Sequence, residues 1–154
     1  MLFRSRRRIL LTWKREISNS SEDFAQLIAL ETGKPIGDAR LEVSIAIAHL
    51  GWAAKKAKYY LKASRRKPGL LMFNMQAEVH RIPYGVIGVI GPWNYPIFTP
   101  MGSIAYALAA GNTVVFKPSE FTPGVGKLLE ESFAQVCEIP NLFKCITGLG
   151  ETGR

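Results

Sequence analysis

The sequence predicts an α/β fold in which helices come first and a parallel sheet follows. From residue 86 onward, short apolar runs rich in β-branched residues alternate with segments of helical periodicity. Before residue 64, the apolar residues recur at helical spacing. The order strand, helix, strand, helix, strand implies right-handed crossovers and therefore a parallel sheet. The chain has 154 residues, of which 47% are apolar and 21% charged, a composition typical of a globular protein with a sizeable core.

The first part of the chain is expected to be helical. A helix is predicted over residues 8–18, and a second one from a capping box at Ser20 and Asp23 to a stop at Gly33. A long third helix is predicted over residues 37–63. Its apolar positions at steps of three and four are Leu41, Ile45, Ala48 and Trp52.

The segment "RRKPG" ends the helical pattern, and residues 70–82 are expected to be extended. The apolar strand Val86–Ile90 follows. Thr99 and Thr122 each precede a proline, which predicts an N-cap and a first helical turn, with helices that run to Ala110 and to about residue 136. The remaining strands are expected at residues 113–117 and 143–147.

The net charge of +8 is concentrated at the start of the chain and between residues 55 and 67. A solvated helix face explains such clusters better than a nucleic-acid surface, and we expect no nucleic-acid partner. No apolar run approaches the roughly 20 residues of a membrane span. The Arg-rich start allows an organellar transit peptide, but the same residues suit a mature helix, so a cytoplasmic protein is expected. Cys137 and Cys145 lack the spacing of metal ligands or of a redox pair, so no metal site is expected.

Polar motifs follow the predicted strands, at the edge of the sheet where ligands of such folds bind. The first is "GPWNYP", in which the amide of Asn94 either stabilises an oxyanion or ties down its own turn. The second is "KPSE", where Lys117 and Glu120 either bind phosphate and ribose oxygens or form a self-capped polar loop. The third is "GLGETG", a G-x-G-x-x-G at Gly148, Gly150 and Gly153 that is a weak signal alone.

Together, "GVIGVIGPWNYP", "ALAAGNTVVFKPSE", "ITGLGETG" and "ALETGKP" resemble the aldehyde dehydrogenase superfamily over residues 9–154. The resemblance implies an incomplete fold of that family: a partial Rossmann-like parallel sheet with N-terminal helices and an extended oligomerisation arm. It divides the chain into a helical part of the cofactor-binding domain (1–68), an arm segment (69–85) and the first βαβαβ part of the NAD(P)-binding domain (86–154). The implied reaction is the oxidation of an aldehyde to a carboxylic acid with NAD(P).

The resemblance also assigns roles to residues near the strand ends. Asn94 matches the amide that stabilises the oxyanion of a cysteine thiohemiacetal. The residues that match the cofactor site are Pro92 and Trp93 beside the nicotinamide, Lys117, Ser119 and Glu120 at the adenosine ribose, and Gly150 near the adenine. Because Glu120 would repel a 2'-phosphate, the expected cofactor is NAD, with NADP possible.

The sequence departs from the family pattern in length. The nucleophilic cysteine and the general-base glutamate of the family are not matched, and neither Cys137 nor Cys145 occupies the position of the nucleophile. The chain is therefore expected to be a fragment without the catalytic domain, inactive alone and a weak binder of NAD. Homo-oligomers are expected to form through residues 69–82. The alternative is a non-catalytic truncated module that pairs with a full-length relative.

Overall fold

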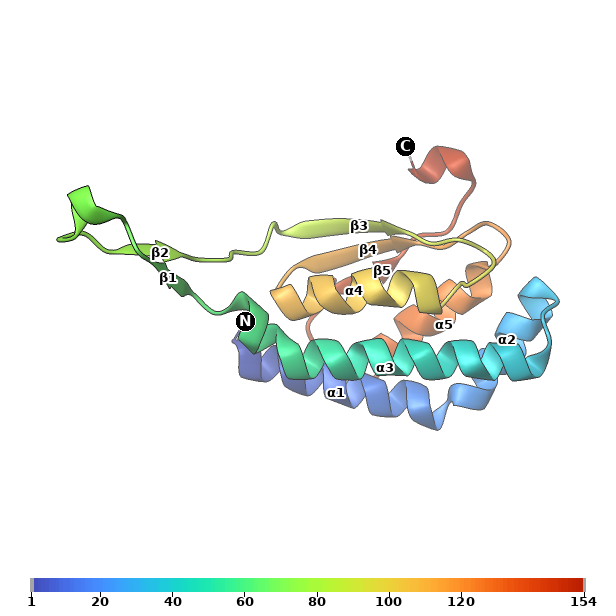
Figure 1. The fold of residues 1–154 in the computed structure, drawn as a ribbon. Helices are drawn as coiled ribbons and strands as arrows, with labels where there is room; N and C mark the ends of the chain where they lie inside the picture. Colours follow the sequence, from blue (N-terminus) through green and yellow to red (C-terminus); the bar gives the residue numbers. More distant parts are fainter. Residues whose placement is uncertain (1, 154) are drawn as a thin grey trace.

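A computed structural model describes residues 2–153; Met1 and Arg154, the outer limits of the predicted first and last regions, lie outside the described part. The α/β class is confirmed (Figure 1). The parallel sheet has the order β3-β4-β5, with Ile90 opposite Lys117 and Phe116 opposite Cys145. Its strands are β3 (Val86–Ile90), β4 (Thr113–Lys117) and β5 (Phe143–Cys145).

The α-helices of the described chain all lie on the same side of this sheet, and no α-helix of residues 2–153 covers the opposite face (Figure 1). The crossover helices α4 and α5 lie directly against the sheet, and the N-terminal helices α1 to α3 form a layer beyond them. The bounds of these helices are α1 (Phe3–Asn19), α2 (Ser21–Thr32), α3 (Ile36–Leu61), α4 (Phe98–Ala110) and α5 (Pro123–Ala134).

An aromatic cluster joins α1 to the sheet. The ring of Trp13 meets Phe133 edge to face at a centroid distance of 4.9 Å and lies 5.5 Å from Phe143. Its indole N–H donates to the hydroxyl of Ser132 at 2.9 Å, so the one polar atom of this fully buried side chain is satisfied. The predicted apolar face of the first helix is therefore the face that builds the core.

The apolar face predicted for α3 is exposed, although apolar residues at steps of three and four usually mark the buried face of a helix. Leu41, Ile45 and Trp52 are 61%, 37% and 47% exposed. The buried face of α3 lies one position further along and consists of smaller residues, because α3 packs closely against its neighbours α1, α2 and α4. Its buried members are Ala39, Glu42, Val43, Ala46, Leu50, Gly51, Ala53 and Ala54.

The helix starts differ from the predicted caps. The hydroxyl of Ser20 donates backwards to the main-chain oxygen of Glu16 at 2.8 Å and does not cap α2. Helix α4 begins at Phe98, one residue before the predicted cap Thr99. Thr122 does stand at the N-cap position of α5, but its hydroxyl makes no capping hydrogen bond. In both crossover helices a glutamate from a distant helix caps the N-terminus instead, as described below.

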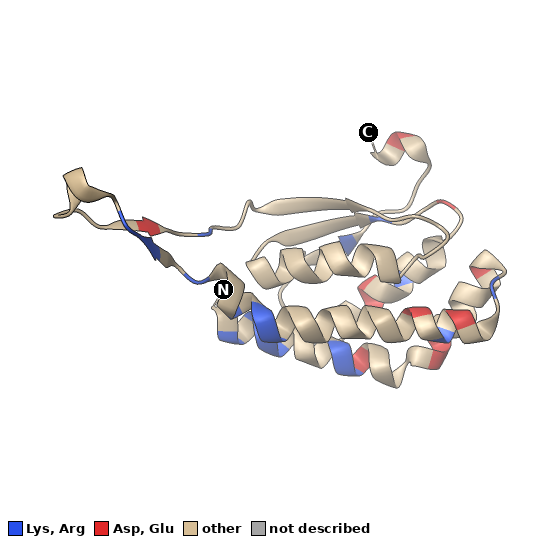
Figure 2. Ribbon diagram, in the orientation of Figure 1, with Lys and Arg blue, Asp and Glu red and all other residues tan. Residues whose placement is uncertain are grey.

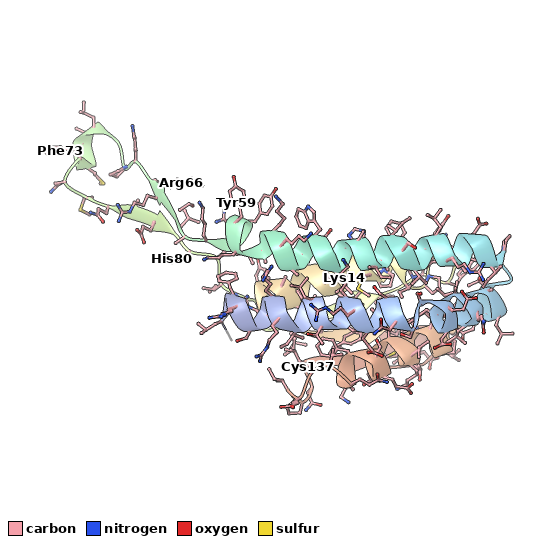
Figure 3. All side chains as sticks on the ribbon, turned by 90° about the horizontal axis from the view of Figure 1, so that it is seen from below. Lys14, Tyr59, Arg66, Phe73, His80 and Cys137 are labelled. Carbon is pink, nitrogen blue, oxygen red and sulfur yellow. The ribbon has the colours of Figure 1, made fainter. Side chains whose placement is uncertain are left out.

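A narrow hairpin leaves the body of the molecule after α3 (Figure 1). Its antiparallel strands are β1 (Ser64–Arg66) and β2 (Ala77–Val79), and the short 3-10 helix η1 (Leu70–Met72) interrupts the segment that was predicted to be extended. We call residues 64–82 the arm. Phe73 lies at its tip and is 83% exposed, and Leu71 is 96% exposed (Figure 3).

Lysine and arginine gather on α1, on the second half of α3 and along the arm, whereas the sheet side carries few charges (Figure 2). This distribution agrees with basic residues on solvated helix faces. Within residues 2–153, no helix is both long enough and apolar enough to cross a membrane.

Candidate functional site

The predicted polar motifs meet at one edge of the sheet, where the parallel strands end. The N–H of Gly91 donates to the main-chain oxygen of Lys117 at 2.9 Å, so the first two motifs are joined directly. After β5, the 3-10 helix η2 (Gly150–Gly153) folds back toward β4. A Cβ atom added to Gly153 would lie 3.4 Å from the Lys117 side chain, which brings the third motif beside the second.

Sterics explain the glycine that opens "GPWNYP". A Cβ atom added to Gly91 would lie 2.8 Å from the ring of Phe116 and 3.4 Å from Pro100. The buried Phe116 belongs to β4, and Pro100 belongs to the first turn of α4. Glycine therefore lets the chain turn over the sheet edge while strand and helix stay in close contact.

Asn94 lies in this turn and is exposed. Its main-chain oxygen accepts a hydrogen bond from Nζ of Lys34 at 2.6 Å. Within residues 2–153, its side-chain amide has no hydrogen-bond partner. The amide therefore does not tie down its own turn and is free to donate to a ligand.

Glu42 is a buried residue beside Asn94 and Lys34 that the sequence analysis missed. Its side chain on α3 is buried, and its Oε1 accepts hydrogen bonds from the N–H groups of Ile97 and Phe98 at 3.0 and 3.2 Å. Its Oε2 forms an ion pair with Lys34 at 2.6 Å. Its helical spacing places Glu42 on the face of small residues, three positions after Ala39 and four before Ala46. This spacing is the one feature of the sequence that relates Glu42 to the buried face of α3.

A groove of about 510 Å³ opens beside Asn94. Its apolar walls come from α3, the turn and the start of α4, and consist of Leu41, Ile45, Tyr95 and Phe98. Its polar members are Lys34, Asp38, Glu42 and Asn94. The exposed side chains of Leu41 and Ile45 on α3 thus form one wall of a ligand-sized groove.

The "KPSE" motif presents both of its charges at the same edge. Lys117 is only 6% exposed, and its Nζ donates to the main-chain oxygen of Pro118 at 3.1 Å. The exposed Glu120 carboxylate accepts from the hydroxyl of Ser119 at 3.4 Å, and Ser119 in turn accepts from the N–H of Phe121. These contacts all lie within the motif, as in the self-capped polar loop that the sequence also allowed.

The other predicted cofactor residues are accessible. Trp93 is 53% exposed and Pro92 is half-buried beside it. Gly150 has open space around its Cα, since an added Cβ atom would meet nothing within 4 Å. In the described chain "GLGETG" ends in the short helix η2, so the strand–turn–α-helix context of a dinucleotide fingerprint is not present there.

Neither crossover helix offers its N-terminus to a phosphate. The N–H groups of Gly124 and Val125 donate to the carboxylate of Glu31 at 2.8 and 3.0 Å, which caps α5. Glu42 caps α4 in the same way. These carboxylates occupy and neutralise the anion sites that helix N-termini otherwise provide.

Both cysteines are buried and neither lines the groove beside Asn94. Cys137 follows α5 at the opposite ends of the strands, and it is buried. Cys145 is buried on the helix side of β5, where its Sγ lies 3.1 Å from the Cβ position of Gly126. Burial raises the pKa of the Cys145 thiol to about 11, so it is a poor nucleophile. Among residues 2–153, no group of three or more His, Cys, Asp or Glu side chains could hold a metal ion.

Comparison with known proteins agrees with this arrangement. The model of the aldehyde dehydrogenase family matches residues 1–154. Two curated relatives are N-succinylglutamate 5-semialdehyde dehydrogenase of Sphingopyxis alaskensis and a probable NADP(+) succinate-semialdehyde dehydrogenase of Sinorhizobium fredii. The first is 39% identical over 138 residues, which are 90% of this chain and 28% of the relative. The second is 41% identical over 120 residues, which are 78% of this chain and 24% of the relative.

Solved structures show the same likeness in three dimensions. The NAD-dependent aldehyde dehydrogenase from Sinorhizobium meliloti superposes with a TM-score of 0.90 at 32% sequence identity. The match covers 98% of this chain and 30% of that protein. The chain thus spans about 30% of the length of the proteins that it resembles.

Proposed function

Since the chain belongs to the aldehyde dehydrogenase family, we propose that its sheet edge forms the oxyanion and cofactor-ribose part of an aldehyde-oxidising site. The observation that carries this proposal is Asn94. Its side-chain amide has no partner within residues 2–153 and lies beside a groove, and the main chain of its turn is anchored at Asn94 and at Ile97. An amide donor in this position would stabilise the oxygen of a tetrahedral thiohemiacetal, which gains negative charge during the reaction.

The groove supplies the place for the aldehyde. Its apolar walls at Leu41, Ile45 and Phe98 suit the carbon chain of the substrate, whose carbonyl oxygen would then reach Asn94. The relatives named above act on semialdehydes. We propose that this protein also oxidises an aldehyde to a carboxylic acid.

The residues after β4 fit the ribose of NAD(P). Lys117 and Glu120 would bind its hydroxyls, Ser119 would orient Glu120, and Gly150, Trp93 and Pro92 would line the neighbouring surface. When bound, the nicotinamide supplies the acceptor for the hydride. Because the Glu120 carboxylate would repel a 2'-phosphate, we propose NAD as the preferred cofactor, although one relative is named for NADP(+).

The nucleophile is proposed to come from outside this chain. Cys137 and Cys145 are both buried, neither lines the groove, and the raised pKa of Cys145 disfavours a thiolate. The isolated chain is therefore expected to produce no NADH from NAD and an aldehyde. The test is absorbance at 340 nm with a panel of apolar aldehydes and semialdehydes, on the isolated chain and on the full-length gene product. Turnover by the isolated chain would contradict the assignment of the nucleophile, and no turnover by the gene product would contradict the proposed reaction.

A second candidate function follows from the arm. Leu71 and Phe73 are almost completely exposed, as expected for a surface that pairs with another subunit. We propose as the alternative a non-catalytic module that joins a longer relative through residues 69–82 of the arm. Mixing the chain with a purified full-length relative and measuring the mass of the complex by light scattering distinguishes this role from the catalytic one.

A further inference from the structure

We propose that Lys34 and Glu42 are positioning residues that hold the main chain of Asn94, and thereby aim its side-chain amide at the groove. The inference rests on the proposed function for its consequence in catalysis, but its structural part concerns the chain alone. Neither residue touches the reacting atoms in this proposal, since both act through the turn that carries Asn94.

Three contacts connect one buried carboxylate to both ends of the turn. Oε1 of Glu42 accepts from the N–H groups of Ile97 and Phe98 and fixes the start of α4. Oε2 of Glu42 binds Nζ of Lys34, which donates to the main-chain oxygen of Asn94 at 2.6 Å. The segment from Asn94 to Phe98 is therefore anchored at its first residue by the lysine and at its last two by the glutamate.

Burial and a neighbouring aromatic ring favour a single arrangement of Lys34 and Glu42. Glu42 is 1% exposed and the Lys34 side chain only 15%, so water competes little for the ion pair between them, whereas the contact of Lys34 with Asn94 lies at the surface. Nζ of Lys34 also lies 4.5 Å from the ring centroid of Tyr95, a cation–π contact with the residue next to Asn94. Buried ion pairs contribute little net stability compared with apolar replacements, but they can select one conformation.

The free amide explains why such an anchor matters for Asn94. Within the described chain, its side chain has no hydrogen bond that would fix its direction. The direction of the amide therefore depends on the main chain of the turn. A misplacement of a catalytic group by about 1 Å can cost on the order of a hundredfold in rate.

Nuclear magnetic resonance of the chain tests the structural part. The variant Lys34→Met removes the contact to Asn94 but leaves the Glu42 cap, and Glu42→Gln keeps an acceptor oxygen for the cap but removes the ion pair. Both are expected to lower the backbone order parameter of Asn94 from about 0.85 to below about 0.6, while the amides of Ile97 and Phe98 stay protected from exchange.

The matched control is Arg40→Met, because Arg40 lies on α3 like Glu42 but forms its exposed ion pair with Glu22 of α2, away from the turn. This variant is expected to leave the order parameter of Asn94 unchanged. An Asn94 that stays equally ordered in Lys34→Met would overturn the proposal, whatever the enzyme activity of the protein.

Kinetics of the full-length gene product test the consequence. Lys34→Met is expected to lower kcat about tenfold at an unchanged KM for NAD, since it misaligns a group without removing it. In the background of Asn94→Ala, the same substitution is expected to have no further effect on kcat, because the group that it positions is gone. Equal losses in both backgrounds would contradict positioning through Asn94. Absence of aldehyde turnover in the unmodified protein would refute the proposed function. The order parameters would still show whether Lys34 and Glu42 hold the main chain of Asn94.

Discussion

Gly91 shows how a single residue shapes the sheet edge. Because an added Cβ atom would lie 2.8 Å from the Phe116 ring, Gly91→Ala is expected to lower the free energy of unfolding by about 1–3 kcal/mol. Gly88 is a matched control in β3, the strand that Gly91 follows, since a Cβ atom there would meet nothing within 4 Å. Urea unfolding of Gly88→Ala should stay within about 0.5 kcal/mol of the parent chain. Equal losses in the two variants would show that the contact with Phe116 does not matter.

Cys145 carries a prediction about pH. Its pKa of about 11 exceeds the ordinary value of 9.0 because the thiol is buried. The folded state therefore keeps its proton where the unfolded chain loses it, so this contribution to stability is present below pH 9 and is lost as the pH rises from 9 to about 11. Replacing Cys145 by alanine should flatten the fall in unfolding free energy over that range.

A thiol-exchange reagent checks the same residue at lower pH. At pH 8 the native chain should react slowly at Cys145, and unfolding in urea should expose it to fast reaction. Fast reaction of the native thiol would contradict its burial.

The start of α5 illustrates capping at the scale of an element. Glu31→Gln keeps one acceptor oxygen but loses the charge and the second strong contact, so it is expected to cost about 0.5–2 kcal/mol in unfolding free energy. Thr122→Val provides the contrast, because the Thr122 hydroxyl is buried without a hydrogen-bond partner within the described residues. That substitution should be neutral or stabilising in thermal unfolding. A large loss of unfolding free energy in Thr122→Val and none in Glu31→Gln would show that Thr122 caps α5, as the local sequence predicted.

The elements differ in how far the sequence could predict them. Strands β3 and β4 were predicted at their observed bounds, because apolar β-branched runs between glycine and proline carry a local signal. The caps Glu42 and Glu31 lie 55 and 93 residues from the N–H groups that they bind, so no local spacing could indicate them. Burial of Glu42 also required knowing which neighbours α3 packs against.

Helix α3 shows a related limit. It has one face with large apolar residues such as Leu41 and Trp52, and another with small ones such as Ala46 and Ala53. Sequence periodicity marks both faces as apolar. The small face is buried because it allows close approach of α1, α2 and α4, and the large face borders the groove. The positions of Asn94, Lys117 and Glu120 after strands indicated them only as candidates, and their expected roles came from the family resemblance, whereas the groove became visible only in three dimensions.

At the scale of the molecule, the body and the arm should behave independently. The arm projects from the body, and its apolar residues contribute little to the core (Figure 1). The double variant Leu71→Ser, Phe73→Ser is expected to leave the midpoint of thermal unfolding nearly unchanged and to shift the chain toward monomers in light scattering. Leu30→Ser is the control, since Leu30 is 81% exposed on α2 and should change neither quantity. Oligomers that persist in the arm variant would place the subunit contact elsewhere, for example on the sheet face that no α-helix of residues 2–153 covers (Figure 1).

The central claim is that the Asn94 amide stabilises an oxyanion at the sheet edge, and single-turnover kinetics of the full-length gene product test it most directly. Asn94→Ala should slow aldehyde-dependent NADH formation about 10²- to 10³-fold, the usual loss for one oxyanion donor, with an unchanged dissociation constant for NAD. Asn19→Ala, at an exposed asparagine that ends α1, should leave the rate unchanged. A rate within about twofold of the parent protein for Asn94→Ala would contradict the account, since this is far below the loss expected for an oxyanion donor.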